Sequence, residues 1–232
     1  MVGIIVSPNE PDTINLSDYF DPTTHTATEA NFLNLLQDEI YTENAIGYKV
    51  ILSNSAAYNN GTYIIADVNH DSANTGQTNC YDLISVDCIY PGSSFGISQD
   101  WKYSYIRTWL NNTFYNGLSS DIKSHIMNIK YNSQGTWYNE DKVTSPSFIE
   151  VNGTTGTTSG GYDSEGVPYP IFTDNNSRIK YQLGTTNAFN WWIRSRAIGN
   201  YNYVWKVYTD GSLLASRYSV SGYCVVPLLR VS

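Results

Sequence analysis

Near the C-terminus two tryptophans stand side by side in the segment Trp191-Trp192-Ile193-Arg194-Ser195. The segment favours a strand, and adjacent side chains of a strand point to opposite faces. Both rings therefore need cover, so the strand must lie inside a layered structure. Packing alone can explain the pair; alternatively, one ring is core and the other lies beneath a ligand surface. We expect Arg194 to be held by carbonyl groups or a carboxylate.

The composition indicates a folded, acidic chain. Charged residues make up 15% of the 232 residues and aromatic residues 14%, which excludes a disordered tail and a coiled coil. The formal net charge of -8 repels phosphate backbones and anionic lipids, so we expect no nucleic-acid partner and no membrane insertion. The 20 tyrosines are typical of adaptable binding surfaces, although a biased genome explains them equally well.

Two observations bear on the cellular compartment. No segment approaches the roughly 18 apolar residues of a spanning helix, and residues 1–11 lack the basic start and apolar run of a signal peptide. We therefore expect a chain made in the cytoplasm. Its three cysteines, Cys80, Cys88 and Cys224, form no Cys-x-x-Cys pair, which predicts free thiols.

The hydrophobic pattern changes near residue 47. Apolar residues at near-helical spacing predict a helix from about Thr28 to Tyr41. Its apolar face needs a partner, either the rest of the fold or sister copies of the same helix in an oligomer. We assign residues 1–47 to an N-terminal attachment or oligomerisation segment and residues 48–232 to the main domain.

Within the main domain, residues 48–53 and 62–67 predict a hairpin around the turn Asn59-Asn60-Gly61. Between Lys102 and Lys130 the spacing predicts two helices, and the second is capped by Ser119 or Ser120 and extends over Ile122, Ile126 and Ile129.

Further along the chain, residues 152–168 are poor in apolar side chains and predict a mobile surface loop. Three later segments, 191–195, 203–208 and 223–231, predict strands, with a turn at 209–212.

The candidate catalytic and metal-binding residues give weak signals. No motif places His25, His70 or His125 beside a nucleophile, and we interpret them as surface or capping residues. The segment from Asp67 to Asp71 resembles the start of a calcium loop. However, its sixth position is Ser72 and its twelfth is Thr78, so we interpret it as a turn-rich connection and expect no metal.

Paired carboxylates for sugar hydrolysis could come from a set of five acidic residues. Because two of them fall in the predicted mobile loop and catalysis needs rigid placement, we interpret the set as solvated surface charge. The five are Glu140, Asp141, Glu150, Asp163 and Glu165.

Several segments together resemble one family. They are Asn190-Trp-Trp-Ile-Arg-Ser195, a Tyr/Asn/Ser-rich stretch, Asp210-Gly-Ser212, a second such stretch, and Cys224-Val-Val-Pro-Leu-Leu-Arg-Val231. This order is similar to the C-terminal variable repeat of diversity-generating retroelement target proteins. Upstream, residues 103–115, 141–151 and 169–180 resemble that family's helix and central connections, and the N-terminal piece resembles the leader of phage-borne members.

The resemblance implies an α+β, C-type-lectin-like fold related to the formylglycine-generating enzyme, preceded by a short helical N-terminal segment. It implies a binding protein that is not an enzyme and has no cofactor, with a variable region at about 190–232. The implied setting is a phage virion tail. The implied partners are a host cell-surface protein or glycan, and possible sister copies bound through the N-terminal segment.

In such systems template adenines are miscopied, so an Asn codon cannot become Trp or Lys; this marks Trp205 and Lys206 as fixed. The implied scaffold of the site is Trp191, Trp192, Arg194 and Trp205. The implied variable, ligand-facing positions are Arg196, Ile198, Asn200, Tyr201, Asn202, Tyr203, Tyr208, Leu214, Ser216, Arg217, Ser219, Val220, Ser221 and Tyr223.

Two alternatives remain open. One is a carbohydrate-binding tail module of fixed specificity, without diversification. The other is an enzyme of the formylglycine-generating type, which needs two thiols side by side in a cleft.

Overall fold

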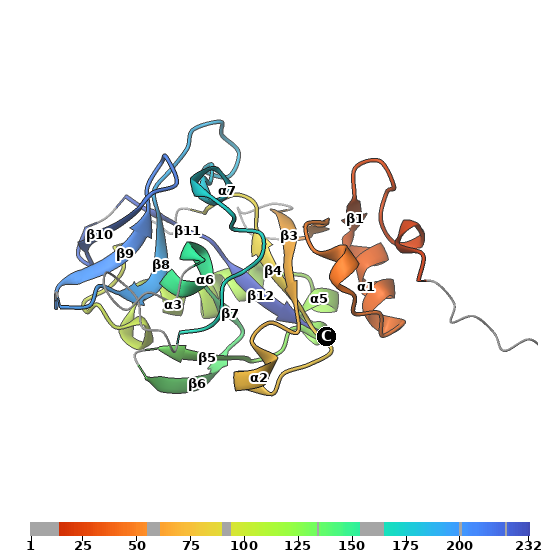
Figure 1. The fold of residues 1–232 in the computed structure, drawn as a ribbon, viewed down its shortest axis with the longest axis horizontal. Helices are drawn as coiled ribbons and strands as arrows, with labels where there is room; N and C mark the ends of the chain where they lie inside the picture. The colour runs from red at the N-terminus through yellow and green to blue at the C-terminus, as the bar shows by residue number, and fades with distance from the viewer. Residues whose placement is uncertain are drawn as a thin grey trace, which may run out of the picture.

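The computed structural model describes residues 14–54, 61–89, 94–133, 135–153, 165–199, 201–220 and 222–232. It has a mixed architecture, with about 26% helix and 33% strand, which confirms the expected combination of helices and strands. The described strands form a six-stranded sheet, a four-stranded sheet and a two-stranded ribbon. Figure 1 shows the N-terminal helix at one end of the molecule and the four-stranded sheet at the other.

The strands are β1 Thr26–Thr28, β2 Lys49–Leu52, β3 Gly61–Val68, β4 Tyr81–Ser85, β5 Ile129–Ser133, β6 Thr136–Asp141, β7 Val143–Thr144, β8 Trp191–Arg196, β9 Tyr203–Val207, β10 Leu213–Arg217, β11 Cys224–Val225 and β12 Leu228–Val231. The α-helices are α1 Glu29–Gln37, α2 Ser72–Thr75, α3 Tyr105–Trp109, α4 Tyr115–Gly117, α5 Ser120–His125, α6 Phe148–Asn152 and α7 Asn175–Arg178. Single helical turns are the 3-10 turns η1 Leu16–Asp18, η2 Glu43–Ala45 and η3 Trp101–Tyr103 and the π turn η4 Leu110–Phe114.

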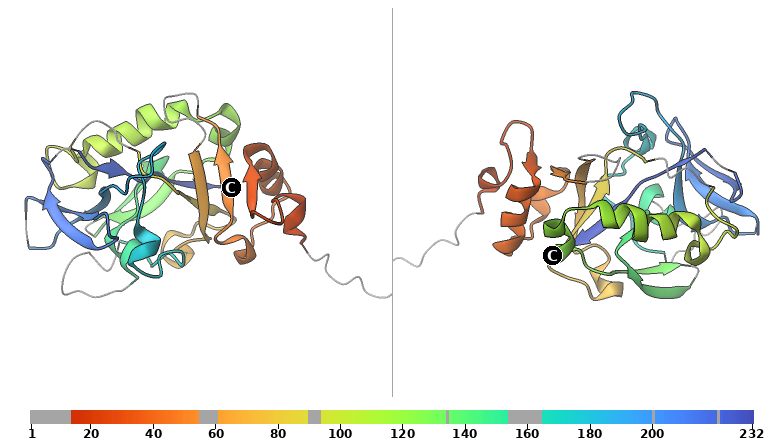
Figure 2. Two further views of the ribbon diagram at one scale, coloured as in Figure 1. Left: turned by 90° about the horizontal axis from the view of Figure 1, so that it is seen from above. Right: turned by 180° about the vertical axis from the view of Figure 1, so that it is seen from behind.

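The six-stranded sheet has the order β1-β2-β3-β4-β12-β7. Its strand β12, close to the C-terminus, lies between β4 and β7 and pairs antiparallel with both. All residues of β4 and β12 are buried, as an almost continuous apolar run predicts for a central strand. The helical segment 105–117, formed by α3, η4 and α4, runs along one side of the molecule (Figure 2).

The predicted N-terminal helix is present but shorter than expected. It begins after Thr28, whose hydroxyl accepts a hydrogen bond from the Asn31 amide at 3.3 Å, and ends at Gln37. Its apolar side chains Phe32, Leu35 and Leu36 are buried in the main core, and the preceding strand β1 pairs in parallel with β2. The rest of the fold therefore covers this face, as the first of the two alternatives proposed.

The predicted hairpin is confirmed by the antiparallel pairing of β2 with β3, while most of its turn lies outside the described residues. The Ser119 cap is also confirmed, since its hydroxyl accepts a hydrogen bond from the Ile122 amide at 3.2 Å. The extension of this helix over Ile129 is wrong. The backbone becomes extended at Ile126, the Met127 amide bonds to the Arg230 carbonyl, and Ile129 begins β5.

The four-stranded sheet has the order β10-β9-β8-β11. Strands β8 and β9 fall where the sequence predicted them, but β10 lies in a stretch for which the sequence predicted no strand. The chain reaches β10 through a tight turn at Gly211, whose φ of 80° is accessible to glycine. The predicted last strand is split at Pro227: β11 pairs with β8, and β12 belongs to the larger sheet.

Because the apolar face of α1 is buried in the main core, its side chains should contribute to the free energy of unfolding. We expect Leu35→Ala to lower the free energy of unfolding by about 2–5 kcal/mol, because it leaves a cavity under the helix. Leu33→Ala, at a partly buried position of the same helix, is the matched control and should cost less. Urea denaturation of both variants measures the difference. Equal small losses would mean that α1 is not part of the core.

Candidate functional site

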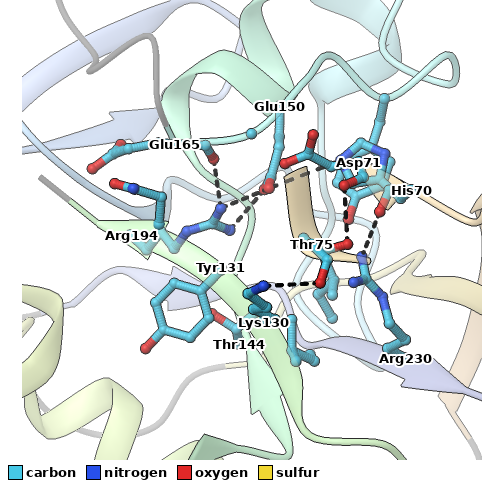
Figure 3. A pocket seen from close by; sticks show the side chains of 15 residues that line it. His70, Asp71, Thr75, Lys130, Tyr131, Thr144, Glu150, Glu165, Arg194 and Arg230 are labelled. Atoms are coloured by element: carbon cyan, nitrogen blue, oxygen red, sulfur yellow. Dashed lines mark hydrogen bonds and ion pairs between the residues drawn. The ribbon is translucent and has the colours of Figure 1, made fainter. Parts of the chain in front are cut away.

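Arg194 of β8 is buried, and both terminal nitrogens of its guanidinium donate hydrogen bonds. Its guanidinium donates to both Glu150 oxygens, at 2.7 and 2.6 Å, to the Ser145 carbonyl at 2.9 Å and to the Glu165 carbonyl at 2.8 Å. Burial alone lowers the pKa of Arg194, but the Glu150 carboxylate outweighs it and holds this pKa above its usual value. Figure 3 shows Arg194 between the two glutamates.

The short helix α6 is fixed to β8 at its first turn. Ser147 and Glu150 cap it reciprocally: the Glu150 amide donates to the Ser147 hydroxyl at 3.2 Å, and the Ser147 amide donates to the Glu150 carboxylate at 2.7 Å. The Ser195 hydroxyl accepts from the Phe148 amide at 2.8 Å and donates to the Glu165 carboxylate. Two consecutive β8 residues, Arg194 and Ser195, thus hold α6 and the segment at Glu165.

A second buried ion pair joins the central strands. Arg230 of β12 lies directly opposite Asp82 of β4 and donates to its two oxygens at 2.6 and 2.7 Å. The Tyr169 hydroxyl donates to the same carboxylate at 2.5 Å. Burial raises the pKa of Asp82, but Arg230 outweighs it, so this pKa lies below its usual value.

A small polar cavity connects the two ion pairs, and Figure 3 shows its lining. His70 stacks on Tyr169 at 3.8 Å between ring centroids, and its Nδ1 lies 2.7 Å from the Asp67 carboxylate. Its Nε2 lies 4.0 Å from a Glu150 oxygen and has no hydrogen-bond partner among the described residues.

These contacts correct two interpretations from the sequence. Of the five candidate carboxylates, Asp141, Glu150 and Glu165 are buried rather than solvated; Glu140 is exposed, and Asp163 lies outside the described residues. Their partners come from distant parts of the sequence, which local patterns do not reveal. His70 is likewise buried and not at the surface.

The stretch 152–168, predicted to be a mobile surface loop, is described only at its two ends, and one of these ends is buried. Residues 154–164 lie outside the described residues, but Glu165, at the end of that stretch, is fully buried. This burial brings Glu165 against β8 and makes it part of the structural support of the C-terminal sheet.

The predicted ligand-facing positions gather on the four-stranded sheet and its turns. Asn200 and Ser221 lie outside the described residues, and the others are all exposed or half-buried, with Tyr201 82% exposed. They are Arg196, Ile198, Tyr201, Asn202, Tyr203, Tyr208, Leu214, Ser216, Arg217, Ser219, Val220 and Tyr223. The predicted scaffold residues Trp191, Trp192 and Arg194 are buried, and Trp205 is half-buried against Phe148.

Backbone contacts place these positions in two neighbouring groups. At one end of the sheet the turn after β8 meets the turn after β10, since Arg217 pairs with Tyr203 and the Tyr218 amide donates to the Asn202 carbonyl. Arg196 at this end lies 3.8 Å from Asp100. The second group, Tyr208, Leu214, Ser216 and Tyr223, lies around Lys206 on the sheet face.

Asp67 and Val68 end β3, and the residues from Asn69 to Asp71 form the turn-rich connection that the sequence indicated. Asn69 and Asp71 have φ values of 54° and 51°, and the Asn69 side chain accepts a hydrogen bond from the Cys80 amide at 3.2 Å. Across the described residues there is no group of three His, Cys, Asp or Glu side chains arranged to hold a metal ion.

The three cysteines are free and buried, which confirms the expected free thiols. Cys88 and Cys224 lie close together, and both are fully buried. This contact and burial raise the pKa of the Cys88 thiol far above its usual value. Such a thiol stays protonated, which does not suit a nucleophile.

Fold and site together define a mixed α and β domain in which buried ion pairs support an exposed, tyrosine-rich sheet. The chain belongs to a family described as a domain of unknown function, DUF6273, whose model matches residues 91–232. The match covers the helical segment, α6 and the whole four-stranded sheet. Searches of curated proteins and of solved structures each found no match. None of the helices in the described residues has the length and apolar character needed to cross a membrane.

Sequence reasoning missed the importance of four residues: Glu150, Glu165, Asp82 and Arg230. One local signal was available for Glu150, since Ser147 three residues before it makes a capping box. Lys206 was marked as fixed, but its place among the candidate ligand-facing residues was not foreseen.

The Glu150–Arg194 pair makes the second prediction. We expect Glu150→Gln to lower the free energy of unfolding by about 3–5 kcal/mol, because Arg194 is left as an uncompensated buried charge. Glu140→Gln removes a carboxylate that is 61% exposed and lies 3.6 Å from Arg107, and should change stability little. Urea denaturation compares the two; similar effects would contradict the role given to Glu150.

The third prediction concerns pH. Because the folded pKa of Asp82 lies below its unfolded value, the stability from this carboxylate is complete above the usual Asp pKa of about 3.9. It is lost as the pH falls through the folded value. The unfolding free energy should therefore fall in acid, and less steeply in Asp82→Asn. Denaturation over a pH series measures how steeply the unfolding free energy falls in the wild-type protein and in Asp82→Asn. Identical slopes for the two proteins would contradict the role given to Asp82.

Proposed function

We propose that this protein is a non-enzymatic binding protein with a C-type-lectin-like domain, the target of a diversity-generating retroelement. Its C-terminal sheet face, with the segments that connect β8 to β9 and β10 to β11, contacts a host-surface ligand. The protein then serves as a phage tail adhesin, released from the host in the assembled virion.

One observation carries this proposal: among the described residues, the predicted ligand-facing positions are exposed or half-buried, whereas the predicted scaffold residues of β8 are buried. The exposed positions include four large apolar or aromatic side chains, Ile198, Tyr201, Tyr208 and Leu214. The supporting residues Trp191, Trp192 and Arg194 are inaccessible to solvent. Side chains of the first kind can change without creating a cavity, whereas those of the second kind cannot.

The binding role is preferred over an enzyme of the formylglycine-generating type. That chemistry needs accessible, ionisable thiols. Cys88 and Cys224 do lie together, but both are fully buried and the pKa of Cys88 is raised. The described residues offer no thiol at the surface.

An adhesin gains strength from several linked copies, because a second contact then occurs at high effective concentration. The covered apolar face of α1 does not supply such a contact, so attachment would use other surfaces of residues 1–47. This part of the proposal rests on the resemblance of the N-terminal piece to phage-borne leaders.

Sequencing the part of the gene that encodes residues 190–232, with its downstream flank, across a natural population tests the proposal. We expect substitutions to concentrate at the ligand-facing positions and at codons with template adenines. A near-copy template and a reverse transcriptase gene should lie nearby. Codons for Trp191, Trp192 and Arg194 are the internal control and should stay constant.

Two results would count against this proposal. An invariant region would remove diversification and leave a lectin-like binder of fixed specificity. Variation without adenine bias, spread equally over buried and exposed codons, would remove the assignment of the binding face as well.

A further inference from the structure

The C-terminal region has the opposite charge balance to the rest of the chain. Residues 190–232 contain five of the 13 basic residues but only one of the 21 acidic residues, Asp210. Two of the five, Arg194 and Arg230, are neutralised in the interior by Glu150 and Asp82. The remaining three, Arg196, Lys206 and Arg217, belong to the proposed binding face.

Lys206 is the unusual member of this group. Only 6% of its surface is exposed, yet among the described residues no carboxylate lies within ion-pair distance of its ammonium group. Its ammonium lies 4.1 Å from the Tyr223 ring centroid and 5.0 Å from that of Tyr208. A largely desolvated cation normally has an anionic partner, and aromatic rings compensate for only part of that loss.

The surroundings of Lys206 open towards the face of the sheet. Strand register places Lys206 opposite both Trp192 and Leu214, so the three side chains share one face. Trp192 is covered by Phe95 and Tyr223, whereas Leu214 is 46% and Tyr208 40% exposed. Lys206 therefore lies at the boundary between the buried scaffold and the exposed surface.

The phenol of Tyr223 completes the arrangement. Burial raises its pKa, but hydrogen bonds with Lys206 and Ser216 and the charge of Lys206 outweigh burial and leave the pKa below its usual value. The Lys206 ammonium thus contacts the Tyr223 phenol and the ring of Tyr208, and none of the carboxylates in the described part of the chain lies within ion-pair distance of it.

We propose that Lys206 receives the carboxylate of an acidic sugar, with Tyr208 and Tyr223 packing on the sugar ring. This deepens the proposed function and rests on it. A pyranose acid carries one carboxylate, several hydroxyl groups and an apolar C–H face, which matches one ammonium, the hydroxyl of Ser216 and two phenol rings. Lys206 thus provides a constant contact within a face whose other side chains vary.

The test uses three sugar acids, glucuronic, galacturonic and N-acetylneuraminic acid, each compared with its own methyl ester. The readout is the change in backbone amide resonances of the full chain. We expect at least one acid to shift the resonances of β9 and β10, and its uncharged ester to bind roughly tenfold more weakly.

Variants assign the contact to Lys206. Lys206→Gln should lose the preference for the acid over its ester, and Lys206→Arg should keep it. Lys102→Gln is the matched control, since the Lys102 ammonium also lies over two tyrosine rings, at 5.8 and 5.7 Å, and these rings, Tyr103 of η3 and Tyr138 of β6, are not part of the four-stranded sheet. Unfolding curves of each variant show whether it is folded.

Three results would overturn the inference: equal binding of acids and esters, an unchanged preference in folded Lys206→Gln, or no shift with any of the three acids. If an aspartate-containing tripeptide shifts β9 and β10 when the sugar acids do not, the ligand is a peptide and the sugar assignment is wrong. The sequencing experiment is independent of these outcomes, so variation at the exposed codons without sugar binding would leave the proposed function standing.

Discussion

The C-terminal half of the structure depends on one buried ion pair, Arg194 with Glu150. Arg194 lies in β8 and Glu150 lies in α6, and the same guanidinium also binds the carbonyl groups of Ser145 and Glu165. A single side chain thus fixes one strand relative to a helix and two connecting segments. The next residue of β8, Ser195, reinforces this attachment through the Phe148 amide and the Glu165 carboxylate.

The pair is better understood as a determinant of geometry than as a source of stability. Removing two charges from water is costly, and their attraction often only compensates for that cost. The pair fixes the orientation of α6 relative to β8, because a guanidinium and a carboxylate bind through two parallel hydrogen bonds. Arg230 and Asp82 repeat the arrangement between β12 and β4, so each of the two larger sheets contains one such contact.

The sequence predicted the elements better than their connections. The hairpin, the Ser119 cap, strands β8 and β9 and the covering of both tryptophans follow from local patterns and were foreseen. The end of α5 was not, because Ile129 keeps helical spacing while its backbone pairs in a ribbon. Glu165 was read as loop charge because nothing near it in the sequence reveals Ser195 or Arg194. Local patterns report propensity and periodicity, whereas the partners of a buried charge are set by tertiary structure.

The separation of buried from exposed side chains in the four-stranded sheet explains how a surface could vary on such a domain. Cross-strand neighbours fix the register of β8, β9 and β10, and the buried pairs include Trp191 with Val207 on one face and Trp192 with Lys206 on the other. The exposed side chains Leu214 and Tyr208 contribute less to that register, since each keeps a large part of its surface in water. Their replacement changes the chemistry of the face while the hydrogen-bonded ladder beneath it stays the same. Lys206 belongs both to the buried ladder and to the exposed face, because it pairs with Trp192 in the sheet while its ammonium lies over the rings of Tyr208 and Tyr223. A residue so placed can hold a binding contact constant while the specificity around it changes.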